Sequence, residues 1–306
     1  MNDLLFGVAF LENDRPLVVR CRGTRGSIPS PGPHTIRFGG NTSCVEILFG
    51  DRRIIFDAGT GIRQLGRDLL SESDEREATI FLTHFHWDHI QGLPFFAPVH
   101  EEDFRIRILA PPQEGVDSEA LICGMMGPVY FPLPFDDFPA EISFRDMDEG
   151  GWESGGVRIK SMRVRHAAHT VGYRLEAGGY SVVYVPDNEL IGGSYPIGGG
   201  WYDRLVAFAG DADLLLHDAM FTPQEYPAKE GWGHSTFDQA LALAERAGVR
   251  KLRFFHHAPP RTDEDLVRIV RSYQGTLGRK GSGLDLRAAE EGIRMTLGPE
   301  ISAKQK

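Results

Sequence analysis

Residues 79–92, TIFLTHFHWDHIQG, carry the most informative pattern in the chain. A short apolar run leads directly into four side chains that can bind metal, namely His84, His86, Asp88 and His89. Side chains alternate between the two faces of an extended segment, so His84 and His86 fall on the same side. Asp88 and His89 follow where the backbone turns. Two imidazoles can therefore hold one metal ion, while a carboxylate and an imidazole begin a second site beside it.

Length and charge limit the kind of protein. The 306 residues are enough for one large α/β domain with a substantial core, and no linker or low-complexity segment divides them. We therefore predict a single domain over residues 1–306, with an N-terminal extension at 1–16 and a tail at 298–306. The 33 basic and 43 acidic residues give a net charge of -10, which is the wrong sign for gripping long nucleic acid through its phosphates. This balance favours a small substrate.

The sequence also bears on location. Cys21, Cys44 and Cys123 match neither a disulfide framework nor a zinc-thiolate spacing, which suggests a reducing compartment. The apolar stretch at residues 4–11 lacks a basic segment before it and a small-residue cleavage site after it, so we do not expect a signal peptide. No run approaches the ~20 apolar residues that a bilayer crossing needs. We expect a cytoplasmic protein without membrane contact, and the oligomeric state stays open, a homodimer included.

The central motif resembles the signature of the metallo-β-lactamase fold superfamily. The longer string HWDHIQGLPFF, with CRGTRGSIPSPG, GGNTSC and GWGHST elsewhere in the chain, is similar to one branch of it. That branch contains ribonuclease Z, the phosphonate-pathway cyclic phosphodiesterase and related cyclic-nucleotide phosphodiesterases. The resemblance covers residues 17–297. It implies an αββα four-layer sandwich, in which two mixed sheets lie face to face and loop ends at one sheet edge form the site.

The resemblance also implies metal ligands outside the central motif. In the family, a histidine six residues before the glycine of a GYR-like sequence completes the first site. Counting back from Gly172 gives His166, which leaves His169 as a substrate-binding or loop residue. Asp187 ends an apolar strand, where the family places a carboxylate that bridges two cations. A cap of the strand end is the alternative for Asp187.

The last ligand follows the strand expected at residues 251–255. His256 and His257 are adjacent, so on an extended segment they face opposite sides and only one can reach the metals. The family position favours His256, with His257 as the fallback.

We therefore expect two divalent metal ions per chain. Imidazole and carboxylate ligands without thiolate suit zinc or manganese, with iron as an alternative. The expected ligands are His84, His86 and His166 for the first ion, Asp88, His89 and His256 for the second, and Asp187 as the bridge.

His234 is the candidate acid. Thr236 and Gln239 fit a capping box, so His234 lies just before a helix amino terminus, where free N–H groups attract anions. A histidine there can protonate a leaving group; the alternative is a helix-start histidine that faces solvent. The surrounding GWGHST resembles phosphodiester-cleaving members rather than β-lactamases. We assign catalytic roles to His234 and Asp88.

Further polar residues are predicted to contact the substrate or the metal ligands. Asp57 is at a strand end, where the resemblance implies an acidic residue that orients a metal-binding histidine through its other ring nitrogen; a cap of the next turn is the alternative. Asn41 and Ser43 either approach the site or only shape their turn. His217 and Asp218 end a buried strand and are expected to form hydrogen bonds beside the metals. The complete set is Asn41, Ser43, Asp57, His169, His217, Asp218 and His257.

Three other segments carry local predictions. Residues 117–126 predict a short helix capped by Ser118. Prolines in residues 127–135 exclude a regular helix or central strand, so we expect a loop whose aromatic side chains either wall a pocket or cover a core edge. Residues 191–200 are rich in glycine without the P-loop pattern, which predicts a mobile loop near the mouth of the site.

The leading function is metal-dependent hydrolysis of a small phosphodiester, either a cyclic nucleotide or a cyclic ribose phosphate. A tRNA 3′-processing endonuclease is the closest rival, although the acidic charge and the lack of a recognisable basic docking arm argue against it. A lactone or thioester hydrolase would use the same metals. An iron-loaded oxidoreductase and a non-catalytic nucleotide sensor come from other classes, and the complete ligand set argues against the sensor.

Overall fold

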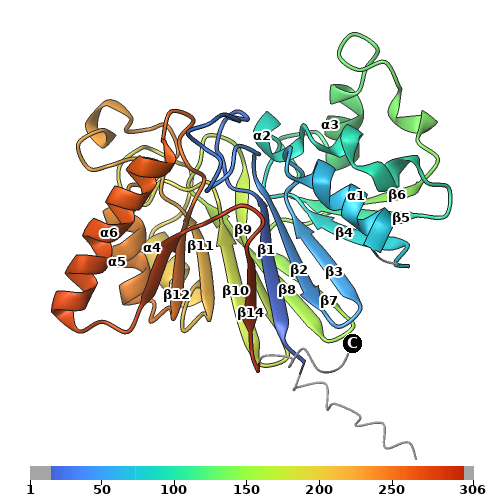
Figure 1. Ribbon diagram of the computed structural model, residues 1–306. Coiled ribbons are helices and arrows are strands. Elements are labelled where there is room, and N and C mark those ends of the chain that lie inside the picture. Colours follow the sequence, from blue (N-terminus) through green and yellow to red (C-terminus); the bar gives the residue numbers. More distant parts are fainter. Residues whose placement is uncertain (1–14, 73, 300–306) are drawn as a thin grey trace, which may run out of the picture.

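Two mixed sheets of seven strands lie face to face in the computed structural model, with helices on both outer surfaces (Figure 1). The structure describes residues 15–72 and 74–299, so the predicted N-terminal extension and tail lie almost wholly outside it. The first sheet has the order β14 (Arg294–Leu297), β1 (Leu17–Gly23), β2 (Cys44–Phe49), β3 (Arg52–Phe56), β4 (Glu77–Phe81), β5 (Arg105–Ala110), β6 (Glu141–Asp146). The second has the order β13 (Asp285–Ala288), β12 (Lys251–Phe255), β11 (Leu214–Asp218), β10 (Tyr180–Val185), β9 (Thr170–Ala177), β8 (Val157–Val164), β7 (Gly150–Ser154). The predicted αββα sandwich is confirmed.

Each sheet combines an antiparallel half with a parallel half. Strands β14, β1, β2 and β3 pair antiparallel, and β3 to β6 pair parallel. Likewise β7 to β10 pair antiparallel, and β10 to β13 pair parallel. Carboxyl ends of parallel strands meet at one edge of a sheet, which is where open α/β sheets build their sites. In this fold the segments that follow β3, β4, β8, β10 and β12 meet at such an edge.

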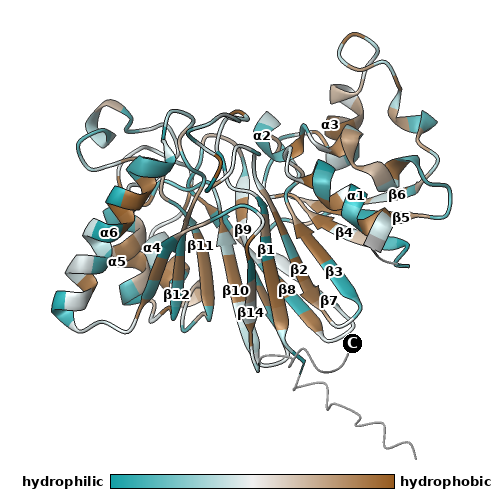
Figure 2. Ribbon diagram, viewed as in Figure 1, coloured by the Kyte–Doolittle hydropathy of each residue, from teal (hydrophilic) through white to brown (hydrophobic). Residues whose placement is uncertain are grey.

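Strand β10 shows how side-chain alternation builds the layers. Val182 and Tyr184 face the other sheet, whereas Val183 and Val185 pack under the helices. Between the sheets, the ring of Phe56 is stacked between two tyrosines, with centroid distances of 5.3 Å to Tyr173 and 5.4 Å to Tyr184. Figure 2 shows the same pattern, because the strands are largely hydrophobic while α6 has a hydrophilic outer surface.

Helices cover the outer face of each sheet. Helix α1 packs on the first sheet, and α4, α5 and α6 pack on the second (Figure 1). The predicted capping box at Thr236 is present at the start of α5, and the structure has a second one at Thr262, at the start of α6. None of the helices in the described residues combines the length and apolar character that a bilayer crossing requires. The α-helices are α1 (Ile62–Glu72), α2 (Trp87–Ile90), α3 (Ser118–Met125), α4 (Trp201–Phe208), α5 (Phe237–Arg246) and α6 (Asp263–Lys280), with 3-10 turns at η2 (Leu93–Phe95), η3 (Ala97–His100), η4 (Phe135–Asp137) and η5 (Tyr226–Ala228).

The segment around α3 departs from its prediction in one detail. Asp117, not Ser118, caps the helix, because its carboxylate accepts the backbone N–H of Ala120 at 2.8 Å. The predicted cap was therefore wrong by one residue. The Ser118 hydroxyl instead donates to Asp146 at 2.7 Å, which ties the helix to β6.

Candidate metal centre

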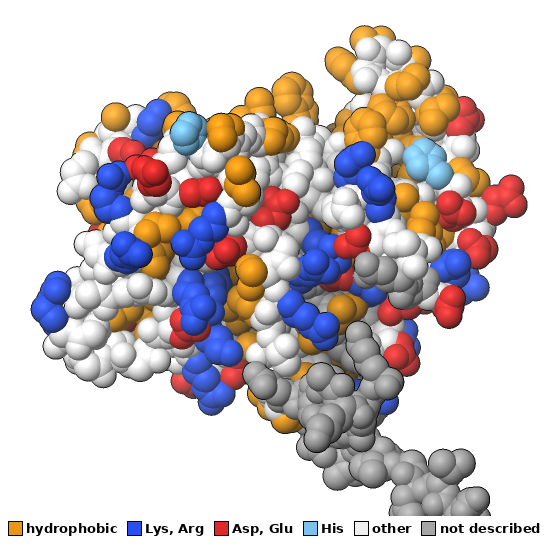
Figure 3. All heavy atoms as spheres, viewed as in Figure 1, with side chains coloured by type: hydrophobic (Ala, Val, Ile, Leu, Met, Phe, Trp, Pro, Cys, Tyr) orange, Lys and Arg blue, Asp and Glu red, His pale blue; other side chains and the backbone are white. Residues whose placement is uncertain are grey.

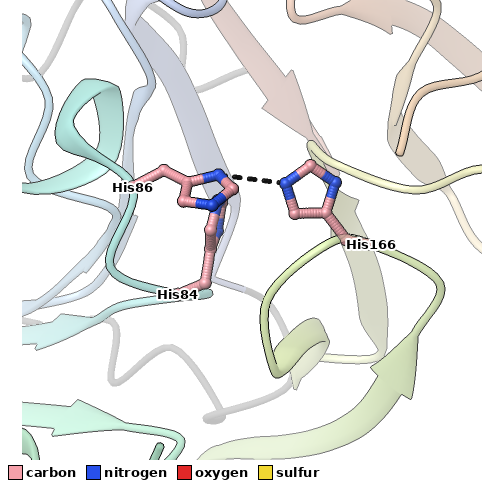
Figure 4. A group of neighbouring side chains, drawn as sticks. All are labelled: His84, His86 and His166. Carbon is pink, nitrogen blue, oxygen red and sulfur yellow. Dashed lines mark hydrogen bonds between the residues drawn. The ribbon is translucent and has the colours of Figure 1, made fainter. Parts of the chain in front are cut away.

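Three histidines from two segments form the first metal-binding group. His84 and His86 follow β4, and His166 follows β8. Each offers a ring nitrogen, and these atoms all lie within 4.8 Å of one another. In Figure 4 the ring of His166 faces that of His86, and His166 Nε2 lies 3.0 Å from His86 Nδ1. Zinc binds imidazole nitrogen at about 2.0–2.1 Å, so nitrogens this close can share one ion.

Hydrogen bonds on the far side of the rings orient two of these histidines. His84 Nδ1 lies 3.0 Å from the Thr83 hydroxyl, and His166 Nδ1 lies 2.9 Å from the carbonyl oxygen of Gly233. The carbonyl can only accept, so His166 Nδ1 carries the proton and Nε2 turns its lone pair toward the group. Burial lowers the pKa of His166 to about 4 and that of His84 well below its usual value. Both rings are therefore neutral, which is the form that binds metal.

A second group lies beside the first. His256 Nε2 is 3.0 Å from Asp88 Oδ2, and His89 Nε2 is 3.3 Å from the same oxygen. The backbone N–H of Ser27 also donates to Asp88 Oδ2, at 2.7 Å. Burial alone would lower the pKa of His89, but the nearby carboxylates of Asp88 and Asp187 raise it well above its usual value. This pocket of negative charge stabilises a cation, whether a proton or a metal ion.

Asp187 lies between the two groups. Its Oδ2 is 2.9 Å from His89 Nε2 and 3.3 Å from His256 Nε2, while its Oδ1 is 3.8 Å from His166 Nε2. Each carboxylate oxygen thus faces one group, which is the arrangement of a bridging ligand. Burial opposes ionisation, but His256 and His89 hold the pKa of Asp187 well below its usual range.

Buried polar atoms at the centre of the cluster test whether metal ions fit. His84 Nε2 is buried without a hydrogen-bond partner, and neither His89 Nε2 nor Asp187 Oδ2 has a contact with hydrogen-bond geometry, although these two atoms lie 2.9 Å apart. Such atoms are costly unless something satisfies them, and here they converge from different strands. Acceptors directed at a common centre fit cations. The histidines and carboxylates of this cluster are therefore suited to hold divalent metal.

Asp57 contacts His89 on the side of the ring that faces away from the second metal group. Its carboxylate accepts the backbone N–H of Thr83 at 2.7 Å and the hydroxyl of Tyr184 at 2.8 Å, and lies 2.8 Å from His89 Nδ1. It therefore orients the His89 ring with Nε2 toward the second group, the first of the two alternatives given by the sequence. Asp57 adopts a left-handed backbone with φ 59°, which aspartate and asparagine tolerate better than most residues.

Asp57→Asn should weaken metal binding about 10- to 100-fold, because asparagine keeps the backbone conformation but loses the charge that orients His89. Competition with a metal-chelating dye would measure this affinity. Asp213→Asn is the matched control, since Asp213 is a buried carboxylate that accepts the backbone N–H of Ser181 at 2.8 Å, outside the cluster. Equal metal affinity in the wild type and Asp57→Asn would contradict this role.

His234 and Asp218 form a pair next to the metal groups. His234 Nδ1 is 2.8 Å from Asp218 Oδ2 and 3.7 Å from Asp187 Oδ1. Backbone N–H groups of Asn188 and Met220 hold the Asp218 carboxylate, each at 3.1 Å. Burial would lower the pKa of His234, but Asp218 and then Asp187 raise it to about 9. His234 is also buried, so it is not the solvent-facing histidine of the alternative interpretation.

In two pairs of histidines that are close in the sequence, the fold brings only one member to the metal groups. His256 adopts a left-handed backbone with φ 57°, which interrupts the strand alternation and turns its ring into the second group. His257 points away, with Nε2 2.9 Å from the carbonyl oxygen of Ala289. His169 also lies outside the cluster, where its Nε2 is 2.7 Å from Asp148.

Three other predicted residues do not reach the cluster. The Asn41 side chain donates to Glu291 at 2.5 Å and accepts from the Thr60 hydroxyl at 3.1 Å, because the GGNTSC turn is braced against its neighbours. The buried hydroxyl of Ser43 has no hydrogen-bond partner among the described residues. His217 Nδ1 lies 2.7 Å from the Asp218 carbonyl oxygen, so it supports the strand end rather than a metal ligand.

Sequence reasoning missed several supporting residues. Gly233 accepts from His166, and a side chain there would run into His166 Nδ1, at a backbone φ of 86°. Its position directly before His234 was the only signal. Thr83 directly precedes His84 and was equally visible in the sequence. Tyr184 gave no signal, because its hydroxyl reaches Asp57 across the space between the two sheets.

The glycine-rich loop at 191–200, predicted to be mobile, is tied to the site at its first half. Glu189 is fully buried and accepts the backbone N–H of Gly233 at 3.0 Å as well as the hydroxyl of Tyr195. Arg165 donates to carbonyl oxygens of the same loop, and its guanidinium lies 5.2 Å from the centre of the Tyr195 ring. Glu189 thereby links the loop to the segment that carries His234.

An open pocket of about 370 Å³ leads to the metal groups. The aromatic loop at 127–135 does not line it; the ring of Phe131 packs on that of Phe95 at 5.7 Å instead. Metal-group residues and His234 form one part of the pocket. The complete lining is Ser27, Phe85, His86, Trp87, Asp88, Asp187, His234 and His256.

Known proteins resemble this chain in sequence and in fold. Ribonuclease Z from Mycobacterium sp. (strain KMS) is 26% identical over 248 residues, covering 76% of this chain and 82% of the relative. The metallo-β-lactamase fold protein YhfI from Bacillus subtilis superposes with a TM-score of 0.66 at 19% identity, covering 92% of this chain and 100% of that one. A diphosphatase from the PhnP family superposes with a TM-score of 0.63 at 19% identity, covering 91% and 97%.

The family profile extends over most of the site. The family described as "Beta-lactamase superfamily domain" matches residues 52–257, a range that begins at β3 and ends just after the last histidine of the second metal group. Together with the two face-to-face sheets and the histidine and aspartate clusters at their edge, this match shows that the chain belongs to the metallo-β-lactamase fold superfamily.

Proposed function

We propose that this protein is a metal-dependent hydrolase of a small phosphodiester, a cyclic nucleotide or a cyclic ribose phosphate. Relatives named ribonuclease Z and the diphosphatase neighbour support the broader class, a metal-dependent hydrolase of phosphoesters. The observation that carries the proposal is the position of the His234–Asp218 pair, 3.7 Å from the carboxylate that lies between two metal-binding groups. An imidazole held by a carboxylate thus stands next to the metal-binding groups, where the phosphate would bind.

The ligand assignment follows the two groups. When bound, two divalent ions would lower the pKa of water toward neutrality and offset the negative charge of the phosphate. Asp88 takes part in catalysis as a ligand in this scheme. The residues assigned to the ions are His84, His86 and His166 for one, Asp88, His89 and His256 for the other, and Asp187 between them.

His234 supplies the proton for the departing oxygen. Asp218 accepts the Nδ1–H, which fixes the ring and stabilises its charge. Nε2–H is then the donor that remains for the substrate. The pocket lining includes His234, so a substrate held at the metal groups lies within reach of this ring.

Charge supports a small substrate over a long one. The net charge is -10, and none of the eight residues that line the described pocket is lysine or arginine. Long nucleic acids are held mainly by cations spread along their phosphates. The ribonuclease Z relatives nevertheless favour tRNA 3′-processing as the second candidate function.

The two candidates differ in their response to salt. Between 50 and 200 mM salt, kcat/KM for a small phosphodiester should fall less than about tenfold, because one phosphate is contacted. An enzyme that grips six to ten phosphates of tRNA should lose on the order of 10³–10⁵-fold. Protein stripped of metal and reloaded with zinc, manganese or iron would be assayed on cyclic mononucleotides, cyclic ribose phosphates, lactones and precursor tRNA. Efficient, steeply salt-dependent cleavage of precursor tRNA alone would replace the first candidate by the second.

A further inference from the structure

Trp87 occupies an unusual place in the metal motif. It stands between His86 and Asp88, and it begins the short helix α2. Although both neighbours belong to the metal-binding groups and Asp88 is buried, the Trp87 side chain is 79% exposed. The backbone of Trp87 is therefore fixed by its two neighbours, His86 and Asp88, while its indole ring projects into solvent.

The faces of this indole are free. Trp87 makes no ring contact and no cation–π contact with any residue of 15–72 or 74–299. The other tryptophans are engaged: Trp152 packs against Phe81 at 5.3 Å, Trp201 lies 5.5 Å from the Arg165 guanidinium, and Trp232 lies 3.7 Å from the Lys229 ammonium. Of the four tryptophans, Trp87 alone has neither a ring partner nor a cation–π partner among the described residues.

Trp87 also forms part of the pocket that leads to the metal groups. Phe85 and Trp87 line it on either side of His86 in the sequence, and Ser27 and the ligands make up the rest. Figure 3 shows hydrophobic side chains along the upper edge of the molecule, where Figure 1 places α2 and the site loops. No lysine or arginine lines this pocket. The part of a substrate that extends beyond a metal-bound phosphate would therefore meet aromatic side chains rather than a positive charge.

We propose that Trp87 determines substrate specificity by stacking on an aromatic base attached to the phosphate. This inference rests on the proposed function for the phosphate position, and it narrows the substrate class to nucleotides over base-free sugar phosphates. Stacking needs a flat ring with an open face next to the bound phosphate, and Trp87 is such a ring. It also tolerates different bases, because every base has a π face.

The test is a binding comparison that does not depend on turnover. Zinc-loaded full-length protein is titrated by calorimetry with adenosine 5′-monophosphate and with ribose 5-phosphate, which share the phosphate and differ in the base. Trp87→Ala should weaken binding of the nucleotide about 10- to 100-fold and change binding of ribose 5-phosphate less than about twofold. Trp87→Phe should retain most of the nucleotide affinity. Tyr130→Ala is the matched control, since Tyr130 is an aromatic residue 81% exposed that does not line the pocket.

Each result decides the inference. It is overturned if wild-type protein binds the nucleotide no more tightly than ribose 5-phosphate, if Trp87→Ala weakens both ligands equally, or if Trp87→Ala leaves both unchanged. Melting curves of the variants check that the fold is kept, as expected for so exposed a side chain. If no phosphodiester is turned over by any metal form, the proposed function fails, and base-dependent binding through Trp87 is still decided by the titrations.

Discussion

Asp187→Ala is expected to abolish phosphodiester hydrolysis and to reduce the metal content of the protein. Asp187 lies at the meeting point of both groups, with His89 at 2.9 Å, His256 at 3.3 Å and His166 at 3.8 Å from its two oxygens. Its removal takes away the negative charge that offsets the repulsion between two cations. We expect kcat/KM to fall by more than about 10³-fold, since the hydrolytic chemistry depends on the ions.

Elemental analysis of purified variants would measure the metal content directly. His166→Ala should lose metal from the first group, whereas His169→Ala is the matched control and should keep both metal and activity. The two histidines are three residues apart, but only His166 lies in the cluster, while His169 pairs with Asp148 at 2.7 Å. Full metal content and activity in Asp187→Ala would contradict the bridging role, and full activity with a single ion per chain would contradict the two-ion scheme.

His234→Ala should keep its metal and lose activity in a way that depends on the leaving group. A sugar alkoxide leaves poorly without a proton, whereas nitrophenolate leaves without help. The variant should therefore lose on the order of 10²–10⁴-fold in kcat/KM on a natural diester and much less on bis(p-nitrophenyl) phosphate.

The companion variant Asp218→Asn separates the two members of the pair. Asp218 Oδ2 lies 2.8 Å from His234 Nδ1. Asp218→Asn should therefore show the same dependence on the leaving group, with a smaller loss of kcat/KM on the natural diester. Steady-state kinetics on both substrates, with metal content measured for each variant, would test this. Equal losses on both diesters would assign His234 to phosphate binding or charge stabilisation instead, and no loss on either would leave it without a catalytic role.

Features set by neighbours in the sequence were predicted well. The capping box at Thr236 depends on a side chain three residues away, and it is present. The strand expected at residues 251–255 is also present with those bounds, as β12. The cap was wrongly assigned to Ser118 because Asp117 and Ser118 can both cap a helix, and the sequence does not say which of the two side chains has another partner. In the structure that partner is Asp146, on β6.

Contacts between distant segments explain what the sequence left open. The sequence left Asn41 either near the site or only shaping its turn, and in the structure its side chain bonds Glu291, 250 positions away. The support of His166 by Gly233 joins residues 67 positions apart, and nothing near His166 announces it. Burial is equally non-local, so the exposure of Trp87, next to a buried ligand, could not be inferred from its surroundings in the chain.

The sequence by itself determined the central motif, because the spacing of His84, His86, Asp88 and His89 is a property of one short stretch, and the sandwich was expected from the resemblance that this motif carries. Only the tertiary structure decided between His256 and His257. The choice depends on a left-handed backbone at His256 that is held by a contact with Asp88, 168 positions earlier. Such a conformation is unfavourable for the isolated chain and persists only where packing around the site stabilises it.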